Sequence, residues 1–450
     1  MKLYPFQEDG VSWLNGNRRA LLADEMGLGK TVQAICAAET PTLVVCPASL
    51  KTNWAREIVR WRAGAPRVAV LSSSSGWTQA AKDADWLVVN YDILHRFEEQ
   101  IRAEPGHYRT VIADEAHYIK NPGAARTKQF LGRGRRSGRP LPRLSAERMI
   151  ALTGTPIMSR PIELWTLWYW LRPETCPSYW DFAKQYCGAD SVNGWDVRGA
   201  ANLDELRERI APWMLRRMKS DVLTELPPKI REAVEIEDEN GALLRKEREA
   251  WGAVSGGARL TDGTFEEVFS RLEPGRPDTS MIAKVRHETA LGKVPYVVSH
   301  VKDLLEKTDK VLVFAYHRDV IAGIQEGLAG DEYGALAITG ETPLAERQRI
   351  VDAFQGSGRG PRVLVGQIQA AGVGLTLTAA STVVFAELDW TPAAMTQAED
   401  RAHRIGQKDA VLVQHVVLAR SLDAYMARAL IRKQQIVAEV LDCPEHAFLA

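Results

Sequence analysis

Several features that would narrow the class of this protein at once are scarce in its sequence. Only five cysteines occur in 450 residues, and none forms a Cys-x-x-Cys pair, which disfavours a zinc site and a disulfide framework. No run of about 18 apolar residues is present, and the opening MKLYPFQEDGVSWL has no apolar core of signal-peptide length. We therefore expect no membrane association and a soluble, intracellular protein that is cytoplasmic or, in a eukaryote, nuclear.

A net charge of one sign is also absent. Lys and Arg together count 57, as do Asp and Glu, so the formal net charge is +0 at pH 7. A neutral chain has no overall field that attracts a polyanion, so any nucleic-acid site must be a local patch. One such patch is RTKQFLGRGRRSGRPLPR, residues 126–143, which carries seven basic residues and no acidic one.

What the sequence does contain is a rhythm of short apolar runs between longer polar stretches. The runs are RALLAD, TLVVCP, DWLVVNYD, TVIADEAH and MIALTGTP in the first half, and KVLVFAYH, GALAITG, RVLVGQI, TVVFAELD and AVLVQHVVLA in the second. Because they are nearly continuous in apolar residues, they are typical of parallel strands covered by helices on both faces. The expected fold class is α/β, with two parallel-sheet domains in tandem, and the chain length suits two domains.

A pair of prolines divides the two halves. Pro227 and Pro228 interrupt any helix and mark a connection, so the expected domains are residues 1–228 and 229–450. Two stretches do not follow the strand and helix rhythm and are interpreted as insertions. They are a Trp-rich helical segment at about 160–213, with Trp165, Trp168 and Trp180 as its core, and a charged, Gly-punctuated segment at about 238–290.

The stretch LLADEMGLGKT is close to a phosphate-binding loop, with Asp24 where the first glycine is expected. A predicted strand precedes it and a helix-like stretch follows, which is the setting such a loop requires. Gly27 and Gly29 would let the backbone approach the phosphates of ATP. Lys30 would neutralise the phosphates, and the Thr31 hydroxyl would hold Mg²⁺. Asp24 lies at the mouth of the loop, so it need not abolish the site. The alternative is a Gly-rich turn with an incidental lysine.

Two further loops follow predicted strands. In VIADEAH, Asp114 is expected to hold Mg²⁺ and Glu115 to orient and deprotonate the attacking water, while a solvated acidic turn is the alternative. In LTGTP, Thr153 and Thr155 are candidates to couple the nucleotide site to a partner groove, or are plain turn residues. Ligands bind at the carboxyl ends of parallel strands, which favours a ligand site over a solvated acidic turn for Asp114 and Glu115.

The second half contributes QAEDRAHRIGQ. Arg401 and Arg404 are three residues apart and in a helix would share one face. An arginine supplied from a facing domain stabilises the charge of a transferring phosphoryl group. The alternative is a surface helix in which these arginines pair with Glu399 and Asp400.

Together these motifs carry a resemblance to a known family. YPFQEDGV, LLADEMGLGKT, LVVCPASLKTNW, VVNYDIL, DEAH, LTGTPI, RRMKSDVLTELPPK, AAGVGLTLTAAS and QAEDRAHRIGQ occur in the order found in the Swi/Snf-like ATPases of helicase superfamily two. The match spans nearly the whole chain, and the second half most resembles the annealing-helicase, HARP-like branch. DEMGLGKT is the family's usual form, so the resemblance implies an intact nucleotide site.

The resemblance implies two RecA-like domains and a DNA-stimulated ATPase that uses ATP and Mg²⁺ to translocate on double-stranded DNA. Such an enzyme remodels or anneals DNA or displaces bound protein. It implies that Gln7 contacts adenine and that Gly374 and Gln397 line the cleft from the second domain. The implied partner is duplex or forked DNA, bound without sequence preference by a monomer; a recruiting protein stays unidentified. Two alternatives stay open: a strand-separating DNA or RNA helicase of the same superfamily, and a nucleotide-dependent switch or scaffold that binds a protein.

The DNA contacts are less readable than the ATP site. The phosphates of DNA are bound by hydroxyls, amides and basic side chains. The candidates in this sequence are Lys51, Thr52, Thr376, Arg216, Arg217, Lys219 and, within the basic segment, Arg133, Arg135, Arg136 and Arg139. The basic segment would add phosphate contacts and steepen the salt dependence of binding. Its alternative is a solvated Gly/Arg/Pro loop. In VLVGQIQAAG the family more often has Ser and Thr, so a hydroxyl contact there is not expected; Gln367 is a possible replacement donor.

Overall fold

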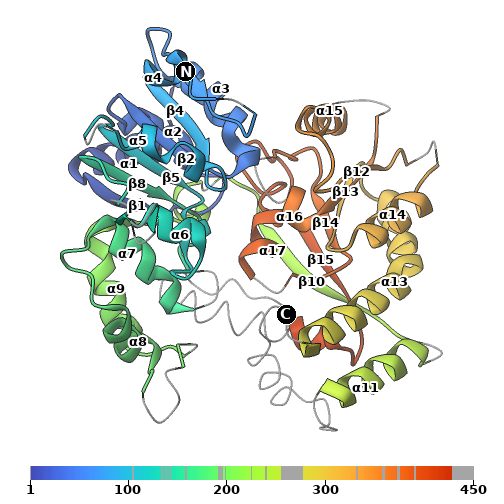
Figure 1. Ribbon diagram of the computed structural model, residues 1–450. Helices are drawn as coiled ribbons and strands as arrows, with labels where there is room; N and C mark the ends of the chain where they lie inside the picture. Colours follow the sequence, from blue (N-terminus) through green and yellow to red (C-terminus); the bar gives the residue numbers. More distant parts are fainter. Residues whose placement is uncertain are drawn as a thin grey trace. The chain divides into compact units, whose positions relative to one another are not determined.

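The computed structural model of the protein falls into two compact units that divide between residues 224 and 225, called unit 1 and unit 2 below (Figure 1). The residues that the structure describes are 2–74, 76–103, 106–132, 135–136, 139–140, 143–157, 160–190, 196–197, 199–223, 225–238, 241–254, 277–330, 333–356, 360–371, 375–389 and 392–427. Among the described helices, none combines the length and the apolar content needed to cross a bilayer.

Unit 1 is built on a seven-stranded sheet in which every pair of neighbouring strands is parallel. In spatial order its strands are β3 (Val68–Val70), β4 (Trp86–Asn90), β2 (Thr42–Cys46), β5 (Thr110–Asp114), β8 (Arg148–Leu152), β1 (Arg19–Leu22) and β9 (Met214–Leu215). Every residue of β2, β4, β5 and β8 is buried, as expected for strands covered on both faces. The sequence predicted all but the short strands β3 and β9.

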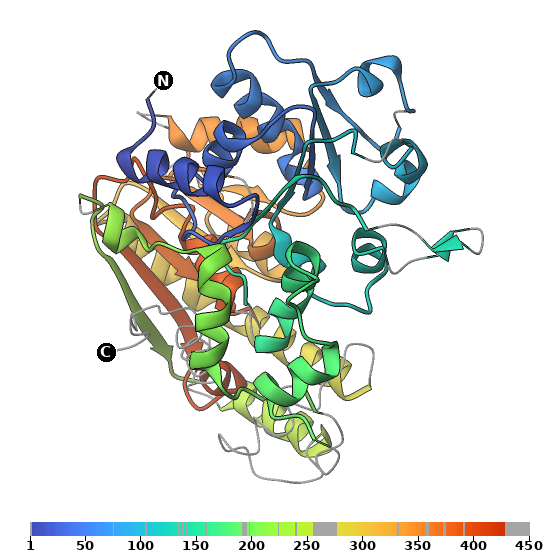
Figure 2. The ribbon, with the colours of Figure 1, turned by 90° about the vertical axis from the view of Figure 1, so that its left-hand side faces the viewer.

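Helices of unit 1 follow most of these strands. They are α1 (Pro5–Gly16), α2 (Lys30–Ala37), η1 (Ala48–Leu50), α3 (Lys51–Trp61), α4 (Gln79–Lys82), η2 (Leu94–Arg96), α5 (Glu98–Ile101), η3 (Ala116–Ile119), α6 (Ala125–Phe130), η4 (Pro161–Leu164), α7 (Trp165–Leu171), α8 (Tyr179–Cys187), α9 (Leu203–Ile210), η5 (Ala211–Trp213) and α10 (Lys219–Val222). In both ribbon views α7, α8 and α9 gather beyond one end of the sheet (Figures 1 and 2).

The Trp-rich segment packs into the same hydrophobic core as the sheet of unit 1. Trp165 and Trp168 are almost fully buried, and the Trp168 ring contacts the rings of Phe182 and Trp213. The prediction for Trp180 is wrong, because half of its surface is exposed. Trp180 stands on α8 outside the face that this helix buries, which begins at Phe182.

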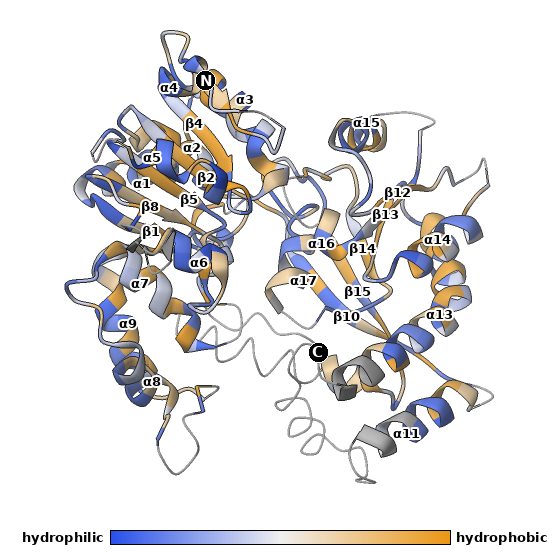
Figure 3. Ribbon diagram, viewed as in Figure 1, coloured by the Kyte–Doolittle hydropathy of each residue, from blue (hydrophilic) through white to orange (hydrophobic). Residues whose placement is uncertain are grey.

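Unit 2 contains a second all-parallel sheet, of six strands. In spatial order they are β10 (Lys229–Ile236), β15 (Val411–Leu418), β14 (Thr382–Phe385), β11 (Val311–Ala315), β13 (Val363–Gln367) and β12 (Leu336–Ile338). The helices of this unit are α11 (Ala242–Val254), α13 (Pro277–Leu305), α14 (Arg318–Gly327), α15 (Leu344–Gln355), α16 (Ile368–Ala371) and α17 (Pro392–Glu399). Coloured by hydropathy, most strands of the two sheets are apolar, whereas β10 is mixed (Figure 3). The predicted α/β fold class is therefore confirmed.

Candidate nucleotide site

The loop between β1 and α2 has the backbone geometry of a phosphate-binding turn. Gly27 and Gly29 have φ of 90° and 75°, in the left-handed region that side chains disfavour, and α2 begins at Lys30. A Cβ atom on Gly29 would also lie 2.4 Å from the side-chain amide nitrogen of Gln7. Glycine at this position is therefore required both by the turn and by its neighbour. The amides at the start of α2 are the groups that bind phosphate at a helix N-terminus.

Gln7 reaches this loop from α1. Its Nε2 donates to the carbonyl oxygen of Leu28 over 3.2 Å, and its Oε1 accepts from the backbone N–H of Tyr4. Only 5% of Gln7 is exposed. The side chain predicted to contact adenine thus packs directly against the phosphate loop.

The Lys30 side chain lies inside the loop. Its ammonium donates to the carbonyl oxygens of Asp24, at 2.7 Å, and Glu25, at 3.2 Å. Burial lowers the pKa of Lys30, while the nearby carboxylates of Glu115, Asp24 and Asp114 act in the opposite direction. The ammonium therefore belongs to the same charged cluster as the two acidic residues that follow β5.

Asp114 is held on both sides of its carboxylate. One oxygen accepts from the indole Nε1 of Trp54 on α3, at 2.7 Å, and the other from the backbone N–H of Glu115, at 2.9 Å. Burial, together with the charge of Glu115, raises the pKa of Asp114 to about 7 despite these hydrogen bonds and Lys30. A buried carboxylate beside a second carboxylate suits a cation, whose charge favours the ionised forms.

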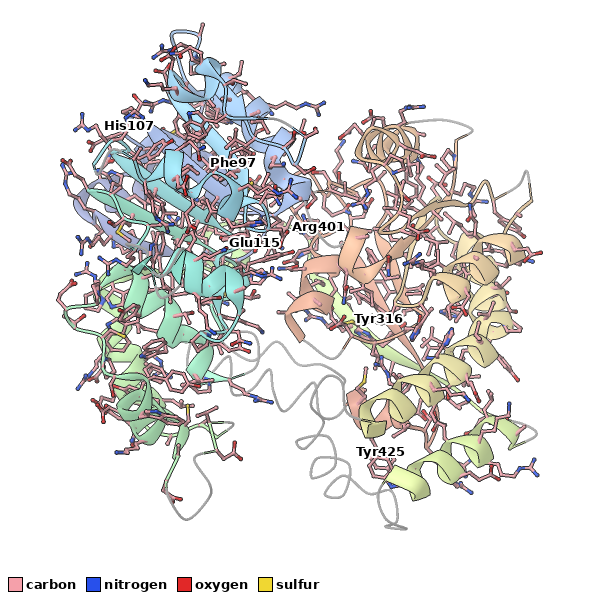
Figure 4. The ribbon with its side chains drawn as sticks, viewed as in Figure 1. Phe97, His107, Glu115, Tyr316, Arg401 and Tyr425 are labelled. Carbon is pink, nitrogen blue, oxygen red and sulfur yellow. The ribbon has the colours of Figure 1, made fainter. Side chains whose placement is uncertain are left out.

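Glu115 has a strained backbone at the end of β5, where Figure 4 labels it. Its φ of 49° and ψ of 52° are left-handed values, and for a residue other than glycine these cost of order 1 kcal/mol. Its carboxylate lies 3.3 Å from Nδ1 of His117, and the same nitrogen lies 3.3 Å from the hydroxyl of Thr153. A Cβ atom on Gly154 would lie 3.4 Å from the Lys30 ammonium. The three loops that the sequence singled out in the first half therefore meet at one edge of the unit 1 sheet.

In unit 2, Arg401 and Arg404 converge, but not for the expected reason. Helix α17 ends at Glu399, so both arginines lie in the turns that follow it and do not share a helical face. Both donate instead to the carbonyl oxygen of Leu375, at 3.3 and 2.9 Å, and Arg404 also donates to the hydroxyl of Thr376 at 3.0 Å. Figure 4 labels Arg401.

Glu399 and Asp400, the acidic residues beside these arginines, contact basic residues of β10. Glu399 accepts from both Nε and Nη2 of Arg231 and lies 2.9 Å from the Lys229 ammonium, which also contacts Asp400 at 3.1 Å. The pKa of Glu399 is lowered to about 2, because the charges of Arg231 and Lys229 outweigh the burial that would raise it. Glu399 and Asp400 thus share a buried network with Lys229 and Arg231 of β10, and the charge of Asp400 also opposes the burial that lowers the pKa of Arg404.

Comparisons with known proteins identify the family of the chain. The SNF2-related domain matches residues 6–241, more than half of the chain, and the helicase conserved C-terminal domain matches residues 296–406. The chain belongs to the SNF2-related family. The prediction of a Swi/Snf-like ATPase made from the motifs is thereby confirmed.

Similar proteins include two named groups. The SNF2-related chain is 37% identical to the SWI/SNF-related matrix-associated actin-dependent regulator of chromatin subfamily A-like protein 1 of Xenopus laevis, over 94% of this chain and 42% of the relative. It is 35% identical to the DNA annealing helicase and endonuclease ZRANB3 of Bos taurus, over 98% of this chain and 41% of the relative. It thus spans less than half the length of either relative. These names support the annealing-helicase branch.

A solved structure is similar along nearly the whole SNF2-related chain. The Sulfolobus solfataricus SWI2/SNF2 ATPase core in complex with dsDNA matches with a TM-score of 0.45 and 25% identity, over 98% of this chain and 93% of that chain.

The residues of this SNF2-related protein fit the nucleotide and metal that its family uses. Unit 1 offers left-handed glycines, the half-buried ammonium of Lys30 and a pair of buried carboxylates. In unit 2, Gln397 is 7% exposed and its side-chain nitrogen finds no hydrogen-bond partner among the described residues. A buried amide of this kind suits a polar ligand. Gly374, the other residue expected from this unit, lies outside the described residues.

The residues expected to contact DNA give a mixed picture. Lys51 donates to the carbonyl oxygen of Leu71 at 2.7 Å, whereas Thr52 beside it, on the first turn of α3, is exposed. Thr376 is exposed and accepts from Arg404. In the basic segment the backbone forms two short antiparallel strands, β6 (Arg135–Arg136) and β7 (Arg139–Pro140). Arg133 and the side chains of Arg135, Arg136 and Arg139 lie outside the described residues.

The residues of VLVGQIQAAG that replace the family's more usual Ser and Thr have a structural explanation. A Cβ atom on Gly366 would lie 2.8 Å from the Ala371 methyl group and 3.1 Å from the Phe314 ring, so a serine would crowd the sheet. The Gln367 side chain accepts from the N–H of Gly340 at 2.8 Å and donates to the carbonyl oxygen of Tyr316 at 3.1 Å. Gln367, the last residue of β13, thus links the end of this strand to the segments that follow β11 and β12, which accounts for an amide at this position.

Two supports of the site were not foreseen from the sequence. Trp54 was quoted only as part of a family motif, and Arg217 was a candidate DNA contact. Trp54 bonds to Asp114, and Arg217 bonds to the Asp24 carboxylate. An aspartate in place of the first glycine of the loop was the signal for the second of these contacts, but its partner lies 193 residues further along the chain.

Proposed function

We propose that this protein is an ATP-dependent double-stranded DNA translocase, that is, a DNA-stimulated ATPase. The observation that carries the proposal is the meeting of the phosphate loop, the two carboxylates after β5 and the LTGTP loop at one edge of the unit 1 sheet. In a parallel sheet this edge is where ligands bind. Family membership gives the site its chemistry.

The chain's own groups have separable parts in hydrolysis. The amides around Gly29 and the Lys30 ammonium bind the phosphates, and Thr31 and Asp114 hold the cation. Glu115 orients the attacking water and accepts its proton, with His117 linking this carboxylate to the LTGTP loop. Mg²⁺ would be held by Thr31 and Asp114 and, when bound, would offset the negative charge that develops on the phosphates.

Residues of unit 2 complete the proposal. Arg401 and Arg404 stabilise the charge of the transferring phosphoryl group, and Gln397 with Gly374 contacts the nucleotide. We further propose that residues 1–228 act as the ATP-binding domain and residues 229–450 as the helicase domain.

DNA is the proposed polymer substrate. It is gripped through its phosphates without sequence preference, by Lys51, Thr52, Thr376 and the basic segment. The names of the relatives favour annealing or remodelling over strand separation. Conversion of a partly unpaired, forked DNA into fully paired duplex, beside separation of a short labelled duplex, distinguishes these outcomes.

The first test is steady-state ATP hydrolysis without nucleic acid and then with single-stranded, double-stranded or forked DNA or with RNA. We expect strong stimulation by duplex or forked DNA that is abolished in Lys30→Ala and Glu115→Gln. Lys82→Ala and Glu208→Gln change exposed residues of the same unit and serve as matched controls that keep wild-type rates. A rate of ATP hydrolysis that no nucleic acid changes would refute the translocase and favour the nucleotide-dependent switch or scaffold.

A further inference from the structure

The aspartate at the mouth of the phosphate loop is a buried ion-pair residue. Asp24 is 0% exposed, and its carboxylate accepts from Arg217 through both oxygens: Nε donates to Oδ1 at 3.0 Å and Nη2 donates to Oδ2. A two-pronged bond of this kind between guanidinium and carboxylate fixes geometry as well as charge. Arg217 lies just after β9, at the end of unit 1.

Two other elements complete the surroundings of this pair. Gln33 on α2 donates to the Asp24 carboxylate at 3.2 Å and accepts from Arg217 at 2.8 Å. The same Gln33 nitrogen lies 3.2 Å from the carbonyl oxygen of Leu28 within the loop. Arg217 also donates to the carbonyl oxygen of Phe6 on α1, and its guanidinium lies over the Phe6 ring at 5.5 Å. The pair therefore connects α1, the phosphate loop and α2.

The backbone of the same segment runs along the loop. The amide of Ala23 donates to the carbonyl oxygen of Leu215 at 2.7 Å, and the amide of Glu25 donates to that of Arg217 at 2.9 Å. Arg216 donates to the carbonyl oxygens of Ala23, at 2.9 Å, and Gly154, at 3.1 Å. Residues 214–217 thus extend the β1 and β9 pairing as far as the mouth of the loop.

The acidic residue after Asp24 is held in the same way. The Glu25 carboxylate accepts from the backbone N–H of Lys219 at 2.6 Å and lies 3.6 Å from its ammonium. The Lys219 side chain is 3% exposed and that of Arg217 is 15% exposed. Two of the basic residues that the sequence offered as DNA contacts are therefore directed at the phosphate loop.

We propose that Asp24 and Arg217 are positioning residues for nucleotide binding, and that the segment 214–219 with its contacts to residues 23–25 forms a clamp on the phosphate loop. This inference rests on the proposed function of the loop. The clamp stands in the last segment of unit 1, immediately before the chain passes to unit 2. Nucleotide affinity therefore depends on the state of this segment, and by linkage a bound nucleotide holds the segment in place.

The variants that test the clamp are Asp24→Asn, Arg217→Gln, the double variant, and the milder Arg217→Lys. Asp85→Asn is the matched control, since Asp85 makes a two-pronged bond with Arg67 at the surface of the same unit. The measurements are the affinity for a fluorescent ATP analogue, the salt dependence of DNA affinity, and hydrogen exchange at the amides of Ala23 and Glu25.

We expect Asp24→Asn and Arg217→Gln to weaken analogue binding by about tenfold, because each leaves a buried charge without its partner. The double variant should lose less binding free energy for the analogue than the sum of the losses in the two single variants. The affinity of Arg217→Lys for the analogue should lie between those of Arg217→Gln and wild type. Asp85→Asn should bind as wild type does. The salt slope of DNA binding should stay unchanged in all of them.

The exchange measurement separates this inference from the proposed function. Exchange at Ala23 and Glu25 should be faster in Asp24→Asn than in wild type even without nucleotide. A nucleotide concentration that saturates wild type should slow this exchange in wild type and in Asp85→Asn, and should slow it less in Asp24→Asn. Wild-type protein that binds no nucleotide would refute the proposed function, while unchanged exchange in Asp24→Asn would refute the clamp. Unaltered nucleotide affinity with a smaller salt slope in Arg217→Gln would make Arg217 a DNA contact instead.

Discussion

Replacing Trp54 by phenylalanine tests whether α3 helps to place the metal-holding carboxylate. The substitution keeps an aromatic ring and removes the indole N–H that donates to Asp114 at 2.7 Å. Trp54 is 1% exposed and Asp114 is 7% exposed, so water cannot easily replace the lost donor. A hydrogen bond to a charged group is worth about 1.5 to 3 kcal/mol, which sets an upper limit of roughly a hundredfold on the effect.

In the proposed complex the indole N–H and the cation contact the same carboxylate, so Trp54 acts by positioning Asp114 and its loss costs only part of that free energy. We therefore expect Trp54→Phe to raise the Mg²⁺ concentration for half-maximal ATP hydrolysis and to lower kcat by about tenfold. The assay is steady-state hydrolysis at saturating duplex DNA over a Mg²⁺ titration, with analogue binding as a readout that does not depend on turnover.

The chain offers a matched control on the same helix. Trp61 donates its indole N–H to Glu57 at 2.9 Å, so Trp61→Phe makes the same chemical change away from Asp114. Thermal unfolding of both variants shows the loss of packing that each suffers. If Trp54→Phe and Trp61→Phe keep the same Mg²⁺ dependence and kcat as wild type, Trp54 does not position Asp114.

Three other predictions follow from the charged groups. Arg404→Ala should lower kcat by about 10³ or more and leave DNA affinity unchanged. Arg420→Ala, which removes an exposed ion pair with Glu237, should keep the wild-type kcat. A wild-type kcat in Arg404→Ala would exclude the proposed role of Arg404. Replacing the basic-segment residues Arg133, Arg135, Arg136 and Arg139 by alanine should weaken DNA binding and flatten its salt slope, and an unchanged slope would contradict this. Glu399→Gln should cost about 3 kcal/mol of unfolding free energy at neutral pH, from the depressed pKa of about 2. Because the folded-state pKa lies below 4.5, that cost should shrink as pH falls from 4.5 toward 2 in an unfolding titration, and a pH-independent cost would contradict it.

Most strands of the two sheets were predictable because a parallel strand covered on both faces must be apolar along its whole length. The short strands β3 and β9 were missed, and so was β10, which does not follow this rule. The sequence of β10, KIREAVEI, mixes charged and apolar residues, its residues are half-buried or exposed, and it begins directly after Pro228. What holds it in the sheet includes the contact of Arg231 with Glu399, which is 168 residues away and leaves no local pattern.

Some residues of the candidate site could likewise be predicted from the sequence, and others could not. Gly27, Gly29, Lys30, Asp114 and Glu115 could be found because phosphate and metal chemistry fixes residue types at short spacings after strands. Arg401 and Arg404 were predicted from their spacing in a family motif, but the helix assumed for them ends at Glu399. Side chains that support the site from distant segments, as Trp54 supports Asp114, carry no such spacing.

Asp24 offers the sharpest contrast between local pattern and long-range contact. Asp24→Gly would bring the loop closer to the general phosphate-loop pattern, and by that pattern alone it should improve nucleotide binding. The structure predicts the opposite: the variant leaves the Arg217 guanidinium partly buried without its carboxylate and adds backbone freedom at the mouth of the loop. We expect Asp24→Gly to bind the fluorescent ATP analogue at least as weakly as Asp24→Asn, because it loses both the charge and the side chain. Tighter binding in Asp24→Gly than in wild type would mean that the loop follows the general pattern and that the aspartate contributes nothing to its placement.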